Sequence, residues 1–164
     1  MAAADDLAPR ETAVRAGVVD VYVVRPYRKT WRVLTMQRSS GTRCPGAWET
    51  VHGRIEAGER PEDAALRELR EETGLEADRL YSITVHPFYL HQWQSVQLAV
   101  VFCAFVREPG DVTLGPEHAH AEWLTVAAAA RRFVWPRERE ALQHIKILLG
   151  TGDAGPVEDV LRIV

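Results

Sequence analysis

The chain has 164 residues, of which 46% are hydrophobic and 26% are charged, and its formal net charge is −3. This length suits one domain with a substantial core. The small negative charge excludes a chain-wide attraction to nucleic acid or to acidic membranes, so an anionic substrate would have to be held by local cations or by a metal.

The sequence predicts neither a signal peptide nor a membrane-spanning helix. The start, MAAADDLAPRE, lacks the basic segment followed by an apolar one that makes a signal peptide. Cys44 and Cys103 form no CxxC pair and are interpreted as structural cysteines of a reducing compartment. The longest apolar run, 96–106, is about half the length of a membrane helix and is expected to be a buried strand. We therefore expect a cytoplasmic protein with no membrane partner.

The first half of the chain is expected to contain three strands and a helix. Valine-rich segments predict strands at 18–24 and 31–38, separated by a break at RPYRKT. A turn-rich loop, RSSGTRCPG, should lead into a short strand, AWETVHG, that ends at Gly53. Pro61 suits the first turn of a helix, and Gly74 suits its left-handed end.

The second half is expected to alternate strands and helices. Strands are predicted at 79–90 and 95–108, around a loop that holds His91 and Trp93, and a loop at 109–116 should precede the strand HAEWL. Two helices, VAAAARRF and 137–149, are split by Pro136. The pattern predicts a single domain of mixed α and β structure over residues 10–150, followed by a loosely docked tail at 151–164.

The stretch GRIEAGERPEDAALRELREETGL, residues 53–75, carries most of the chemistry. Glu68, Glu71 and Glu72 stand at i, i+3 and i+4, so a helix places them on one face, where they repel one another by roughly 0.2–0.5 kcal/mol per pair. A hard divalent cation, Mg²⁺ or Mn²⁺, would remove that repulsion. The alternative is a solvated helix in which Arg67 simply pairs with Glu71.

The spacing of this stretch is specific. It fits G-x5-E-x7-R-E-U-x-E-E-x-G-U, where U is a bulky aliphatic residue, and a chance match is on the order of 10⁻⁹ to 10⁻¹⁰ per start position. It resembles the Nudix box of the MutT/Nudix hydrolases at every defining position. The resemblance implies an α/β (α+β) fold with a mixed β-sheet between α-helices, and metal-dependent hydrolysis of a nucleoside diphosphate linked to another group.

The resemblance also implies roles for individual residues. The metal ligands would be the Gly53 carbonyl and the carboxylates of Glu68, Glu71 and Glu72. Arg67 and Glu59 would orient them by charge-assisted bonds. Such a site neutralises the diphosphate and acidifies a water, with Glu68 or Glu71 as the base.

Shorter stretches around the box narrow the resemblance. VLTMQR, GAWETVHG and PEHAHAEWL…WPRERE are similar to bacterial Nudix pyrophosphohydrolases that act on dihydroneopterin triphosphate and on nucleoside triphosphates such as dATP. That group cuts a triphosphate to a monophosphate and pyrophosphate, so the expected partner is a small nucleotide or pterin triphosphate. Hydrolysis of diadenosine polyphosphates or nucleotide sugars of the ADP-ribose type is the alternative, and a non-catalytic nucleotide-sensing module is another. The oligomeric state is left open.

Further site candidates lie outside the box. Arg38 is a phosphate clamp or a solvated strand end, and Trp48 stacks on a base or belongs to the core. Trp93, in an aromatic loop with Phe88, Tyr89 and His91, lines a base or pterin pocket or packs the hairpin.

A fourth carboxylate is expected from a loop. Glu117 would complete the site as a ligand or as the base, because three helical glutamates approach an ion from one side only, and Glu122 is its rival. His118 and His120 alternate on one strand, but a zinc site would need a third ligand that the sequence does not supply.

Overall fold

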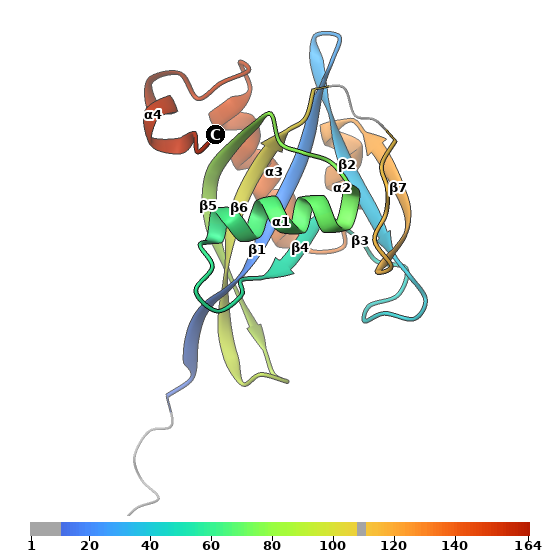
Figure 1. The fold of residues 1–164 in the computed structure, drawn as a ribbon, viewed down its shortest axis with the longest axis vertical. Helices are drawn as coiled ribbons and strands as arrows, with labels where there is room; N and C mark the ends of the chain where they lie inside the picture. The colour runs from blue at the N-terminus through green and yellow to red at the C-terminus, as the bar shows by residue number, and fades with distance from the viewer. Residues whose placement is uncertain (1–10, 108–110) are drawn as a thin grey trace, which may run out of the picture.

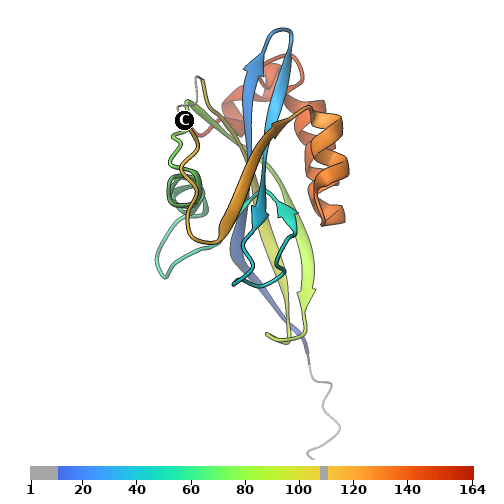
Figure 2. The same cartoon turned by 90° about the vertical axis from the view of Figure 1, so that its right-hand side faces the viewer.

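The computed structural model describes residues 11–107 and 111–164, which form a mixed sheet with helices on both faces (Figure 1). The strands are β1 (Ala13–Tyr27), β2 (Thr30–Arg38), β3 (Trp48–Glu49), β4 (Val51–Arg54), β5 (Arg79–Leu90), β6 (Ser95–Phe105) and β7 (His118–Leu124). The helices are α1 (Pro61–Thr73), α2 (Val126–Arg132), α3 (Pro136–Leu149), a 3₁₀ turn η1 (Gly155–Val157) and α4 (Glu158–Leu161). Helix α1 covers one face of the sheet, and α2 and α3 cover the other (Figure 2).

Strand β1 is the centre of the sheet. It pairs in parallel with β6 along most of its length, and in antiparallel fashion with two other strands. Its residues 18–21 pair with β4, whereas residues 24–27 pair with β2, which in turn pairs with β3 and β7. The sheet therefore divides into a fork, with β4 on one arm and β2, β3 and β7 on the other.

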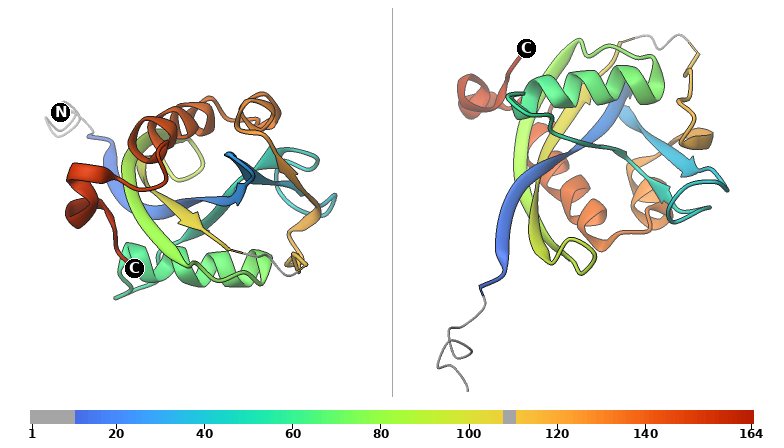
Figure 3. Two further views of the ribbon diagram at one scale, coloured as in Figure 1. Left: turned by 90° about the horizontal axis from the view of Figure 1, so that it is seen from above. Right: turned by 60° about the horizontal axis from the view of Figure 1, so that its bottom comes forward.

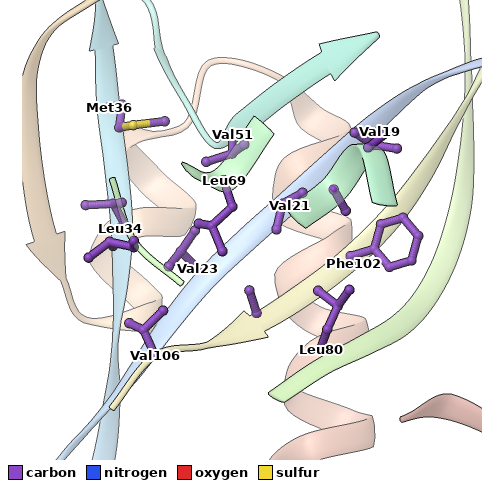
Figure 4. Close-up of a cluster of buried hydrophobic side chains, with 14 residues drawn as sticks. Val19, Val21, Val23, Leu34, Met36, Val51, Leu69, Leu80, Phe102 and Val106 are labelled. Atoms are coloured by element: carbon purple, nitrogen blue, oxygen red, sulfur yellow. The ribbon is translucent and has the colours of Figure 1, made fainter. Parts of the chain in front are cut away.

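The alternation of side chains along β1 supplies two cores. Val19, Val21 and Val23 point toward α1 and pack against the fully buried Leu69 (Figure 4). Tyr22 and Val24 point to the opposite face, where they pack in a second cluster with Phe133 of the α2–α3 side. Each fully buried aliphatic side chain of this size contributes about 1.5–3 kcal/mol.

The strands predicted at 18–24 and 31–38 were shorter than the observed strands β1 and β2. Strand β1 extends from residue 13 to residue 27, and the break predicted at RPYRKT is only a tight turn in which Arg28 has φ 54°. The extra residues at its start pair with Ser95 and Val96 of β6. This pairing partner is about eighty residues away in sequence, so no local pattern indicates it.

The prediction of one strand over AWETVHG was wrong. The segment divides at Thr50 into β3 and β4, which pair with different strands. Thr50 is held at the division because its hydroxyl donates to the Val21 carbonyl (2.6 Å) and its N–H donates to Glu138 of α3 (2.8 Å).

Other predicted elements were confirmed. Helix α1 begins at Pro61 and ends at Gly74, which has φ 69°. Strand β5 follows the predicted segment, β6 begins at the predicted Ser95 but ends at Phe105 rather than at 108, and β7 begins at His118, two residues before HAEWL. The two late helices are present, with Pro136 as the first residue of the second. Part of the predicted loop at 109–116, and residue 10 at the predicted domain start, lie outside the described residues.

The segment after Gly150 is packed rather than loosely docked. Its end adds a bridge to β5 between Tyr81 and Arg162, and the Ile163 N–H donates to the Leu80 carbonyl (2.8 Å). The Tyr81 hydroxyl donates to Glu158 (2.9 Å), and Ala154 is buried. Figure 3 shows this tail, in red, beside β5. The described helices include none long and apolar enough to cross a bilayer.

Candidate functional site

The site begins where β4 meets α1. A Cβ atom at Gly53 would lie 1.9 Å from Cδ of Glu68, so a side chain here would have to displace that carboxyl group. The backbone of Gly53 therefore lies directly against the Glu68 side chain. Burial raises the pKa of Glu68 above its usual range, despite the opposing effect of Arg67.

Arg67 joins the loop before α1 to the carboxylates on the helix. Its Nε and Nη2 donate to the two oxygens of Glu59 (2.8 and 2.9 Å), and Nη2 also donates to the Arg54 carbonyl (2.8 Å). Nη1 donates to Glu68 (2.8 Å) and, less closely, to Glu71 (3.3 Å). The paired guanidinium holds the pKa of Glu59 at about 2. These contacts favour the orienting role over a simple surface pair with Glu71, which is the longest contact of the set.

Glu72 is the buried carboxylate of the group. Its Oε2 has no hydrogen-bond partner within the described residues. Burial, followed by the charges of Glu68 and Glu49, raises the pKa of Glu72 to about 9. Glu71, by contrast, has a side chain that is 59% exposed.

The oxygen atoms of this site suit a hard divalent cation. They comprise three carboxylates on one helix face, an unpaired buried oxygen on Glu72, and the backbone of Gly53 against Glu68. Oxygen ligands of this kind are those that Mg²⁺ and Mn²⁺ prefer. Within residues 11–107 and 111–164, no three His, Cys, Asp or Glu side chains are gathered closely enough to enclose an ion as they stand, and Glu68 is turned toward Arg67.

A second group of polar side chains comes from the other arm of the fork. Arg38 contacts Glu49 (2.8 Å) and Glu117 (3.4 Å) through Nη1. His118 is buried, with Nε2 3.2 Å from Glu49 and Nδ1 4.0 Å from the unpaired oxygen of Glu72. The network thus reaches the box carboxylates and brings Glu117 to their side.

The rival carboxylate points elsewhere. Glu122 lies 3.4 Å from Arg132 of α2, on the opposite face of the sheet from α1. His120 is exposed, whereas His118 is buried against Glu49, so the two histidines occupy different environments.

The predicted substrate-contacting aromatics are distributed over several places. Trp48 carries the Arg132 guanidinium over its ring (4.4 Å), which places it beside α2 rather than with the carboxylates. Trp93 lies at the β5–β6 turn, where the guanidinium of Arg54, at the end of β4, stands 4.6 Å from its ring centre. The guanidinium of Arg137 lies over the ring of Phe88, 4.6 Å from its centre, while Tyr89 is 58% exposed.

Sequence reasoning missed a polar cluster on the α3 face. Asp20 in β1 is 1% exposed and contacts Nδ1 of His52 and Nε of Arg137. Burial disfavours a charged imidazole, but Asp20 outweighs it and raises the pKa of His52. The signal was present, because a lone aspartate within the apolar run VVDVYVV must find partners when it is buried. Glu49 was missed for lack of any comparable signal.

Known proteins are similar to this chain in sequence. A family model described as the NUDIX domain matches residues 11–145. The chain is 36% identical over 128 residues to an octanoyltransferase of Myxococcus xanthus, a match covering 77% of this chain and 35% of that protein. It is 38% identical over 69 residues to an RNA pyrophosphohydrolase of Cereibacter sphaeroides, covering 38% of this chain and 43% of the relative. The chain thus spans less than half the length of these curated relatives.

Solved structures share the fold. A C. elegans Ap4A hydrolase superposes with a TM-score of 0.68 at 20% identity, covering 82% of this chain and 97% of the other. The E. coli dihydroneopterin triphosphate pyrophosphohydrolase superposes with a TM-score of 0.63 at 23% identity, covering 84% and 99%.

Proposed function

The chain belongs to the Nudix family, and from that premise we propose that it is a metal-dependent pyrophosphohydrolase. Its substrate would be a nucleoside triphosphate or dihydroneopterin triphosphate, cleaved to a monophosphate and pyrophosphate. The observation that carries the proposal is the buried Glu72, whose Oε2 has no hydrogen-bond partner within the described residues and lies 4.0 Å from Nδ1 of His118.

The proposed ligands for Mg²⁺ or Mn²⁺ are the Gly53 carbonyl and the carboxylates of Glu68, Glu71, Glu72 and Glu117. A bound ion would supply charge neutralisation of the phosphates and acidification of a water. The chain itself would position the carboxylates through Arg67 and Glu59, and would contact a phosphate through Arg38. The proton acceptor would be Glu68, Glu71 or Glu117.

A substrate panel with Mg²⁺ tests the activity. We expect pyrophosphate release from nucleoside triphosphates or dihydroneopterin triphosphate, and loss of that release on chelation. Turnover of Ap4A or ADP-ribose alone would favour the alternative hydrolase functions. Nucleotide binding without turnover would indicate a sensing module and would contradict the proposal.

A matched pair of variants tests the role of Glu117. Glu117→Gln should lower turnover by about 10²-fold or more, as loss of a positioned proton acceptor typically does. Glu122→Gln, in strand β7 that follows Glu117 but paired with Arg132, should be close to neutral. Equal activity of both variants would show that another group completes the site.

A further inference from the structure

The polar cluster on the α3 face is built around one buried carboxylate. Oδ1 of Asp20 contacts Nδ1 of His52, and Oδ2 of Asp20 lies 3.3 Å from Nε of Arg137. These three residues come from β1, β4 and α3, so the cluster joins elements that lie far apart in sequence. A buried carboxylate with two such partners fixes their side chains in place.

Arg137 is held in a way that leaves donors free. Its guanidinium lies over the ring of Phe88 (4.6 Å) and near that of Trp135 (5.3 Å). Asp20 engages only Nε, and neither Nη group makes a hydrogen bond to the described part of the chain. The four N–H donors of these two groups therefore form no hydrogen bond within residues 11–107 and 111–164.

Two further polar atoms in this region lack a hydrogen-bond partner in the part of the chain that the structure describes. The Tyr22 hydroxyl and Nδ1 of His86 are both buried and make no hydrogen bond to residues 11–107 or 111–164. Tyr22 is close enough to feel the charges of Asp20 and Arg137, and so is His86. Buried polar atoms are nearly always hydrogen-bonded in native proteins, so the region calls for a polar ligand or water.

The cluster is adjacent to the proposed catalytic carboxylates. His52 directly precedes Gly53 in β4, and successive side chains in a strand point to opposite faces. The His52 imidazole therefore lies on the α3 face, while Gly53 meets Glu68 on the α1 face. The β4 backbone therefore separates the two groups, and the ring of a triphosphate bound at the carboxylates would have to extend past the edge of β4 to reach the cluster.

We propose that Arg137, positioned by Asp20, recognises a substrate ring with two neighbouring acceptors on one edge. This inference rests on the proposed function and narrows its substrate. Two guanidinium N–H groups match the O6 and N7 acceptors of guanine, and equally the O4 and N5 acceptors of a dihydropterin. Adenine presents an amino donor in place of the oxygen, so its edge meets the guanidinium donor to donor. The inference favours guanine and pterin substrates over dATP and Ap4A.

Equilibrium binding of GMP and AMP with Mg²⁺, measured by calorimetry on the full chain, tests the inference. Wild-type protein should bind GMP about 10- to 100-fold more tightly than AMP. Arg137→Lys keeps the charge but lacks the planar fork, so GMP should bind no better than AMP. Arg139→Lys, two residues along α3 and outside the cluster, should preserve the preference.

Several results would overturn the inference. They are equal binding of GMP and AMP by the wild type, no binding of either nucleotide, or an unchanged preference in Arg137→Lys. The wild-type comparison requires no variant, so it stands even if Arg137→Lys folds poorly. Because no bond is cleaved, these results are independent of the hydrolysis panel. A guanine preference without turnover would leave the inference intact and remove the proposed activity.

Discussion

Gly53 is the residue at which the β4 backbone lies against the Glu68 side chain of α1. Because an added methyl group would overlap the Glu68 carboxyl group, Gly53→Ala must displace either β4 or Glu68. We expect a loss of about 1–3 kcal/mol of unfolding free energy, as overpacking usually costs, together with weaker Mn²⁺ binding in titrations. Gly41→Ala, where nothing lies within 4 Å of the added atom, is the control and should leave both unchanged.

Arg67 is expected to act through its planar shape as well as its charge. Lysine at this position cannot donate in parallel to both oxygens of Glu59 while also reaching Glu68. Arg67→Lys should lower turnover by about 10- to 100-fold, as loss of a group that orients metal ligands does. Steady-state kinetics beside the exposed Arg70→Lys would measure this, and matching rates would restore the surface-pair interpretation.

The box residues were readable from the sequence because they lie within one strand–loop–helix unit with fixed spacing. Glu49 and the Asp20–His52–Arg137 cluster were not, because their side chains meet only through the pairing of β1 with β4 and the packing of α3. In the structure Glu117 contacts Arg38 and Glu122 contacts Arg132, and the roles of both carboxylates stay predictions.

At the scale of elements, Glu138 connects α3 to the division between β3 and β4. It is 1% exposed and accepts hydrogen bonds from the backbone N–H groups of Thr50 and Trp135. Glu138→Ala leaves the buried Thr50 N–H without a partner, so unfolding should cost about 1–3 kcal/mol less. Glu140→Ala, at an exposed position two residues further along α3, should be neutral in the same denaturation experiment.

The effect of Glu138 should depend on pH. Burial raises the pKa of Glu138 from 4.5 to about 8. A folded-state pKa above the unfolded value means that the group contributes most below pH 4.5, and progressively less as the pH rises to 8. The difference in unfolding free energy between wild type and Glu138→Ala should therefore shrink from pH 5 to pH 8. A difference that grows over that range would show that the carboxyl group is ionised in the folded protein.

Local patterns predicted the elements that carry their own signals. Helix α1 has Pro61 at its start and Gly74 at its end, and β5 and β6 are long runs of β-forming residues. The patterns failed where distant partners decide. The start of β1 depends on β6, the division at Thr50 depends on Glu138, and the tail is held by Leu80 and Tyr81 of β5.

At the scale of the whole molecule, metal binding should be coupled to proton release. The pKa of Glu72 is about 9 without a metal, so an ion that binds this carboxylate must displace its proton near neutral pH. The apparent Mn²⁺ affinity should rise by up to about tenfold per pH unit between pH 6 and pH 8. Calorimetry in buffers of different ionisation enthalpy would count the protons released.

Glu72→Gln provides the test of this coupling. The variant should lose most activity and the proton release, while Glu76→Gln, which is 79% exposed, should keep both. Without metal, the raised pKa of Glu72 penalises the wild-type fold from pH 4.5 up to pH 9. The variant should therefore be as stable as wild type at about pH 4 and more stable at pH 8, and a lower melting temperature at pH 8 would contradict this.

The parallel pairing of β1 with β6 has a consequence for how the protein folds. Everything in the box lies within the connection between these two strands, whose paired residues are about eighty positions apart. Closing so long a connection has a large entropic cost before any contact rewards it, and such topologies fold slowly. The pairing of β1 with β6 should therefore limit the rate of refolding. Metal ions added to the denatured chain should not increase this rate, because β4 and β2, the two arms of the fork, come together only after β1 and β6 have paired.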